Sequence, residues 1–234
     1  IIVSLVGSEM CIRDRMNPRA IFFGSIGTLA ETSDLQRRAY NQAFEEIKLD
    51  WHWDVELYKK LLKKSGGRSR IQDYATQNGI NVDVPSLHQR KTEIFNKSMA
   101  EKTLALRPGV SEVINYAIDA KMYLAFVTTT SKANVDALFF ALDKQIQRSS
   151  FNFIGDETMV SNPKPNPEIY QKALTELGVK STECIAIEDT QISMEAALAA
   201  DIECVAFPGL IAQENNFNSA KAVTEILSPS YFLF

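Results

Sequence analysis

The sequence is poor in the features that define several common protein classes. Its 234 residues include only three cysteines, and two of them, Cys184 and Cys204, lie in apolar runs typical of buried strands. This excludes a disulfide framework and indicates a reducing, cytoplasmic compartment. No apolar run approaches the roughly 18 residues that a membrane span requires. The formal net charge is −4, without the basic excess of nucleic-acid binding proteins. We therefore expect neither a membrane nor a nucleic acid as a partner.

The first fifteen residues do not resemble natural protein sequence. The run LVGSEMCIRDR, residues 5–15, back-translates without a gap into a string that resembles a sequencing-library adapter ending in a transposon mosaic end. The preceding IIVSLV lacks a basic leader and is followed by Gly-Ser-Glu instead of a small-residue cleavage site, which argues against a signal peptide. We interpret residues 1–15 as an adapter-derived scar and expect the natural chain to start at Met16.

From residue 19 onward, short apolar runs alternate with longer amphipathic stretches, which is typical of parallel strands joined by helices. Strands are expected at 19–24, 123–130, 151–155, 184–189 and 203–207. Several helices follow one another between the first two strands, with no strand between Gly27 and Thr103. The pattern predicts an α/β fold, a doubly wound parallel sheet with an inserted helical cap. We assign 16–30 and 104–234 to the core and 31–103 to the cap.

Polar residues follow the strands at the edge where such sheets bind ligands. Thr128 and Thr129 end the second strand, Lys164 follows the third, and Glu188 and Asp189 end the fourth. Hydroxyl groups and a lysine suit a phosphoryl group, and adjacent carboxylates suit Mg²⁺. The sequence therefore predicts a phosphate and magnesium site at this edge of the sheet.

Five segments occur in a familiar order: NQAFEEIKLDWHWDVELYKKLLKKSGGRSRI, LRPGV, FVTTTSKANV, NPKPNPEIY and CIAIEDT. Together they resemble the haloacid dehalogenase superfamily and, more narrowly, its CbbY-like sugar-phosphate phosphatases, relatives of β-phosphoglucomutase. The first segment looks like the cap of a xylulose-1,5-bisphosphate phosphatase. The resemblance implies that Arg68 and Arg70 contact substrate from the cap, that Thr128 and Lys164 bind phosphate, and that the two acids of the fifth segment bind Mg²⁺.

The first motif of that family, DxDGT, is incomplete in this chain. The family's first aspartate attacks phosphorus and binds Mg²⁺, and its second acts as general acid and base. Here Gly24 stands at the nucleophile position and Ile26 at the acid/base position, whereas Gly27 and Thr28 are kept. The cap also departs from the family pattern where substrate is expected, at Ser33, Gln36, Arg68 and Ser69. The resemblance therefore implies a phosphatase fold without its covalent chemistry.

No replacement nucleophile is apparent. Because side chains alternate along a strand, Ser25 is expected to face away from the pocket that positions 24 and 26 face. Thr28 and Thr128 have no base beside them, since His52 and His88 are assigned to the cap, His88 to its surface. An unactivated hydroxyl is a weak nucleophile. We expect little or no phosphatase activity.

The leading hypothesis is a catalytically weak or inactive homologue that binds a phosphorylated sugar or a similar small anion. Glu188 and Asp189 could still hold Mg²⁺ with weakened affinity, because Mg²⁺ needs few protein carboxylates. One alternative is an active, divergent hydrolase that uses a metal-activated water. Another is a structural or interaction module with a vestigial pocket, and a protein partner is left open.

Overall fold

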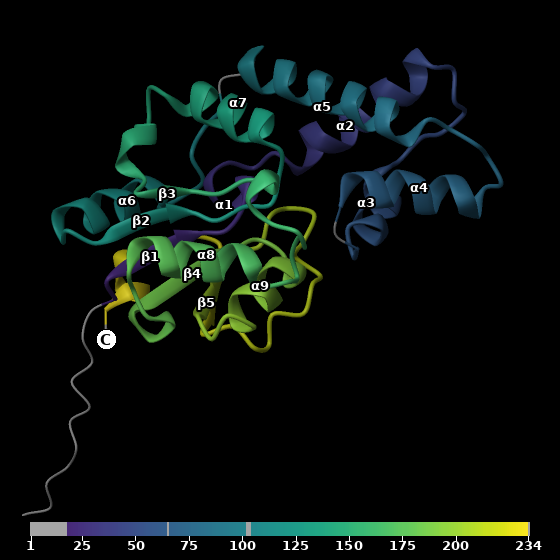
Figure 1. Ribbon diagram of the computed structural model, residues 1–234. Helices are drawn as coiled ribbons and strands as arrows, with labels where there is room; N and C mark the ends of the chain where they lie inside the picture. The colour runs from purple at the N-terminus through teal and green to yellow at the C-terminus, as the bar shows by residue number, and fades with distance from the viewer. Residues whose placement is uncertain (1–17, 65, 102–103, 234) are drawn as a thin grey trace, which may run out of the picture.

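The computed structural model describes residues 18–64, 66–101 and 104–233, and the segment interpreted as a scar lies outside these ranges. Six strands form one parallel sheet in the order β3-β2-β1-β4-β5-β6 (Figure 1). They are β1 (Ala20–Phe23), β2 (Tyr123–Phe126), β3 (Phe153–Ile154), β4 (Cys184–Glu188), β5 (Glu203–Ala206) and β6 (Ala222–Val223). The predicted doubly wound α/β fold is confirmed. Strand β1 lies at the centre, paired with β2 and β4.

Both faces of the sheet are covered by helices. Alternate residues of β1 point to opposite faces: Ile21 and Phe23 pack into a core with α6 (Val110–Asp119) and α7 (Lys132–Leu142). Ala20 and Phe22 pack into a second core with α8 (Glu168–Leu177) and α9 (Gln191–Leu198). A central parallel strand buried on both faces contains almost only apolar residues. That is why the short run AIFF was sufficient to predict it.

Six helices of the described chain come between β1 and β2, and five of them precede α6. The short α1 (Ile26–Leu29) follows β1 directly, and then come α2 (Ser33–Glu46), α3 (Val55–Leu61), α4 (Gly67–Gln77) and α5 (Val84–Glu101). No strand occurs among the described residues of this stretch, as predicted. Figure 1 shows α2 to α5 grouped apart from the sheet at the upper right, with α5 beside α7 of the core. We propose 31–103 as the extent of this cap.

An aromatic cluster holds the cap helices together. Trp53 is fully buried, and its ring centroid lies 4.7 Å from that of Tyr40, 4.8 Å from Phe44 and 5.4 Å from Tyr74. These rings come from α2, α4 and the loop between α2 and α3. Large aromatic side chains contribute most of the apolar area of a small core. The cluster therefore fixes α2, α4 and the loop between α2 and α3 relative to one another.

Two features of the sheet differ from the sequence-based prediction. Strand β2 ends at Phe126, so Thr128 and Thr129 lie in the loop that follows it, and β6 was not predicted. β6 has only two residues, one of them exposed, and pairs with β5 at the edge of the sheet. A strand of two residues is too short to leave a periodic pattern in the sequence.

Candidate functional site

A buried polar cluster occupies the carboxyl ends of β1 and β4. Lys164 Nζ donates to Glu188 Oε1 at 2.5 Å, to the Gly24 carbonyl at 2.7 Å and to the Tyr170 hydroxyl at 3.4 Å. The Tyr170 hydroxyl in turn donates to Glu188 Oε1 at 2.5 Å. Lys164 is 4% exposed and Glu188 is fully buried. All three N–H groups of the Lys164 ammonium are thus directed at protein atoms, and none is left for a phosphate.

The absence of a side chain at Gly24 allows Glu188 to take this position. A Cβ on residue 24 would overlap the Glu188 carboxylate. That carboxylate therefore fills the space beside the backbone where the resembled motif has its nucleophile. Burial raises the pKa of Glu188, while the Lys164 charge and the Lys164 and Tyr170 hydrogen bonds lower it. The neighbouring Ile26 is 5% exposed and belongs to the apolar core.

Asp189 lies next to this cluster and is bound by an unexpected partner. The Ser25 hydroxyl donates to Asp189 Oδ1 at 2.7 Å. The prediction that Ser25 faces away was wrong, because β1 ends at Phe23 and the alternation of a strand no longer applies at the residue before α1. Burial raises the pKa of Asp189, against the Ser25 hydrogen bond and the charge of Arg107.

The acids at the end of β4 provide a sparse set of ligands for Mg²⁺. Glu188 Oε2 is buried and accepts no hydrogen bond from the described residues, so one carboxylate oxygen is open for a cation. Within the described ranges, however, no three His, Cys, Asp or Glu side chains gather as a metal cluster. Glu188 Oε1 and Asp189 Oδ1 already accept hydrogen bonds. Two adjacent carboxylates are thus the ligands that this end of β4 could offer to Mg²⁺.

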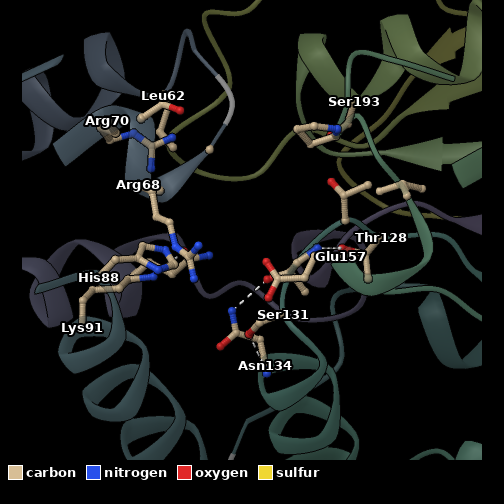
Figure 2. Close-up of a pocket in the computed structure, with 18 of the residues that line it drawn as sticks. Leu62, Arg68, Arg70, His88, Lys91, Thr128, Ser131, Asn134, Glu157 and Ser193 are labelled. Carbon is tan, nitrogen blue, oxygen red and sulfur yellow. Dashed lines mark hydrogen bonds between the residues drawn. The ribbon is translucent and has the colours of Figure 1, made fainter. Parts of the chain in front are cut away.

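A cavity of about 640 Å³ lies between the cap and the core. Thr128, Thr129 and the start of α7 line it from the core, and Arg68 and Arg70 line it from the cap. Figure 2 shows Arg68 reaching into the space opposite Thr128. The lining does not include Lys164, Glu188 or Asp189. The predicted site residues therefore fall into two groups, one around the cavity and one in the buried cluster.

The core wall of the cavity is rich in hydroxyl and amide groups. The Thr130 N–H donates to Thr128 Oγ1 at 3.2 Å, Asn134 Nδ2 donates to Thr130 Oγ1 at 2.8 Å, and Ser131 caps the N-terminus of α7. Asn134 Oδ1 is buried without a partner among the described residues. A helix N-terminus attracts anions, and an unpaired amide oxygen can accept from a hydroxyl group. This wall therefore suits a ligand that carries an anionic group and a hydroxyl group.

The two cap arginines differ in what they bind. Arg70 is buried and donates to the carbonyls of Leu61 at 3.0 Å and Lys64 at 3.1 Å and to the Tyr40 hydroxyl at 3.4 Å. These bonds hold the turn between α3 and α4. Arg68 is exposed and makes no hydrogen bond or ion pair with the described part of the chain. Of the pair, Arg68 is the guanidinium available to a ligand.

Two further residues of the cavity were missed by the sequence analysis. His88 was expected on the cap surface, but it is half-buried and lines the cavity, as does Lys91 three residues later (Figure 2). Residues three apart share one face of a helix, and this face of α5 is turned toward the core. Burial and the charges of Lys91, Arg68 and Arg70 lower the pKa of His88 to about 4.

A Gly67→Ala substitution is expected to destabilise the cap. An added Cβ would lie 2.5 Å from His88 Nε2 and 2.7 Å from the Tyr40 hydroxyl, and overpacking of this kind costs about 1–3 kcal/mol. Urea unfolding measures the loss. Ser69→Ala, on the same helix and exposed, is the control, and equal stability of the two variants would contradict the packing described around His88.

Comparison with known proteins finds similarity to the haloacid dehalogenase-like hydrolases. A family model described as haloacid dehalogenase-like hydrolase matches residues 27–207. Protein CbbY of Cereibacter sphaeroides is 41% identical over 204 residues, which cover 86% of this chain and 89% of that protein.

Solved structures agree with that sequence similarity. CbbY from Rhodobacter sphaeroides in complex with phosphate superposes with a TM-score of 0.82 at 37% identity, over 89% of this chain and 94% of that one. A variant of that protein in complex with xylulose-(1,5)bisphosphate superposes with a TM-score of 0.83 at the same identity and the same coverage. The similarity includes both the sheet and the helical insertion.

Proposed function

The chain belongs to the haloacid dehalogenase-like hydrolases, in the CbbY-like group of sugar-phosphate phosphatases, and from that premise we propose that it binds a phosphorylated sugar without hydrolysing it. The observation that carries the proposal is the position of Glu188. Its carboxylate fills the space at Gly24 and pairs with Lys164. The space of the family's nucleophile is therefore filled by the closed ion pair of Glu188 and Lys164.

Loss of the first-motif acids removes both chemical steps of the family reaction. Gly24 has no side chain to attack phosphorus, and Ile26 has no proton to give to the leaving group. The Ser25 hydroxyl donates to Asp189 and lies outside the lining of the cavity, so it is not placed to attack a phosphoryl group bound there. Removing members of a catalytic unit in another hydrolase costs about a millionfold. We infer that turnover is absent or very slow.

The cavity supports binding. Arg68 offers an unpaired guanidinium, the start of α7 offers backbone N–H groups and the hydroxyls of Thr129 and Ser131, and Asn134 Oδ1 offers an acceptor for a sugar hydroxyl. Guanidinium groups and helix N-termini are common phosphate ligands. One relative, crystallised with phosphate and, as a variant, with xylulose-(1,5)bisphosphate, supports a ligand of this class. We propose a phosphorylated sugar or a similar small anion.

We propose that Mg²⁺ binding is weakened in this chain. Glu188 and Asp189 would hold the ion, which supplies positive charge next to a phosphoryl group when it is bound. Glu188 must first give up one of two hydrogen bonds or bind through its open Oε2. Asp189 is likewise engaged by Ser25. Mg²⁺ therefore competes with hydrogen bonds that both acids already make within the protein.

We propose a cytoplasmic location from the state of the cysteines. Cys184 and Cys204 are both free and buried in the second core, which is typical of proteins in a reducing compartment. Separately, no helix in the described ranges is long and apolar enough to span a bilayer.

An Arg68→Ala variant tests the binding proposal. Isothermal titration of the protein with xylulose 1,5-bisphosphate is expected to show binding that weakens about tenfold to a hundredfold in the variant, because a hydrogen bond to a charged group contributes about 1.5–3 kcal/mol. The control is Lys63→Ala, which removes an exposed cation from the cap outside the cavity. Absence of binding by the parent chain, or equal weakening in both variants, would contradict the proposal.

A further inference from the structure

Lys91 lies in the cavity wall without an acidic partner. Its side chain is 3% exposed, and Nζ donates to the Gln36 amide oxygen at 3.0 Å. The same nitrogen lies 4.7 Å from the centroid of the Tyr40 ring and 4.8 Å from that of Phe95. No aspartate or glutamate of the described chain pairs with it. A buried ammonium that lacks a carboxylate is costly to keep charged.

The surroundings of Lys91 favour its neutral amine. Arg70 is its principal charged neighbour, and Arg68 lies on the same side of the cavity, so the nearby charge is positive. Burial and Arg70 lower the pKa of Lys91 to about 7. A desolvated lysine beside another cation is the arrangement that exposes the nitrogen lone pair and makes lysine a nucleophile toward carbonyl groups.

The proposed ligand class carries such a carbonyl. In a ketose phosphorylated at both ends of a five-carbon chain, the hydroxyl that would close the ring is esterified, so the ketone stays open. Figure 2 shows Lys91 and Arg68 entering from the cap and Thr128, Ser131 and Asn134 lying across the cavity. A sugar held by its phosphate at the opposite wall would place its chain in the space that Lys91 lines.

We propose that Lys91 forms a reversible imine with the carbonyl carbon of a phosphorylated ketose or aldose bound in this cavity, an inference that rests on the proposed function. The amine nitrogen adds to the carbonyl carbon, and one N–H proton passes to the oxygen, giving a carbinolamine. The oxygen then leaves as water while a C=N bond forms. Overall, an ammonium and a carbonyl give a protonated imine and one water, so no oxidant or reductant is required, and water reverses the step.

This chemistry gives the cavity a use that needs neither missing aspartate. The Lys91 nitrogen and the closed cluster of Lys164 and Glu188 belong to different groups, since the cavity lining contains Lys91 but neither of the other two. Hydrolysis at phosphorus and capture at a carbonyl carbon are therefore independent. The protein would retain a sugar by its carbonyl and release it unchanged.

Borohydride trapping tests the imine directly. The full chain is incubated with xylulose 1,5-bisphosphate, reduced with sodium cyanoborohydride, and analysed by intact mass and peptide mapping. We expect one adduct, on the peptide that contains Lys91. Lys91→Arg keeps the charge but has no reactive lone pair and is expected to lose the adduct, whereas Lys97→Arg, an exposed lysine of the same helix, is expected to keep it. Mapping on the parent chain locates the adduct even if Lys91→Arg fails to fold.

The matching alditol bisphosphate, which has no carbonyl, separates the two proposals. If both compounds bind by calorimetry and only the ketose labels Lys91, the imine is supported. If both bind and labelling is absent, or is spread equally over surface lysines, the imine is overturned while the binding function stands. If neither compound binds, the proposed function fails, and the imine fails with it.

Discussion

The double variant Gly24→Asp/Ile26→Asp is expected to release phosphate from xylulose 1,5-bisphosphate in the presence of Mg²⁺, where the parent chain releases none. A Cβ at position 24 cannot coexist with the present Glu188 carboxylate, so the substitution forces Glu188 to leave its pairing with Lys164. That movement places three carboxylates near the strand ends, which is a better magnesium site than two. Because a lost catalytic unit costs about a millionfold, the gain is expected to span several powers of ten.

The variant Gly24→Asn/Ile26→Asp is the matched control for this gain. It introduces the same bulk at position 24 and the same acid at position 26 but has no carboxylate nucleophile, so it is expected to stay inactive. Failure of the double aspartate variant to turn over, while it still binds the bisphosphate as the parent does, would contradict the account. The loss of activity would then arise from the cap residues, Arg68 and Ser69 among them.

A Lys164→Met substitution is expected to give the largest loss of stability, about 3–5 kcal/mol, which is the range for removing one partner of a buried ion pair. Lys164 is 4% exposed and Glu188 is fully buried. Removing the ammonium leaves the carboxylate with only the Tyr170 hydroxyl as donor. The free energy of unfolding from guanidinium titration measures the effect.

Two comparisons identify the cause of that loss. Lys172→Met breaks an ion pair with Glu168 whose atoms are 4.0 Å apart on the surface, and exposed pairs contribute about 0–1 kcal/mol. Adding Glu188→Gln to Lys164→Met removes the unpaired charge and is expected to restore part of the stability. If Lys164→Met is no more harmful than Lys172→Met, then Lys164 is not held in the buried pair described here.

Much of the fold could be predicted from the sequence because the central strands are buried on both faces. The runs at β1 and β4 contain almost only apolar residues, and both strands lie inside the ranges expected for them. Where burial is one-sided or an element is very short, as in α1 and β6, the pattern is too brief to fix the structure. The assignment of Ser25 depended on this point, since it extended the alternation of the strand to position 26, where α1 begins.

The candidate site was predicted in its residue types but not in its contacts. Thr128 and Arg68 line one cavity, whereas Lys164 and Glu188 are paired in a separate buried cluster. That pairing depends on the space left by Gly24, and a sequence pattern does not show which side chain fills a vacancy. Lys91 was missed because a lysine among the charged residues of α5 resembles a solvated face, and only the packing of α2 against α5 reveals its burial.

The measurement that tests the central claim most directly is phosphate release from xylulose 1,5-bisphosphate by the purified parent chain with Mg²⁺, run beside an Asp189→Asn variant prepared identically. The account predicts that release by the parent does not exceed release by the variant, because neither an attacking carboxylate nor a general acid is present. Release that the parent sustains and Asp189→Asn abolishes would contradict it. The chain would then be a hydrolase that uses a metal-activated water.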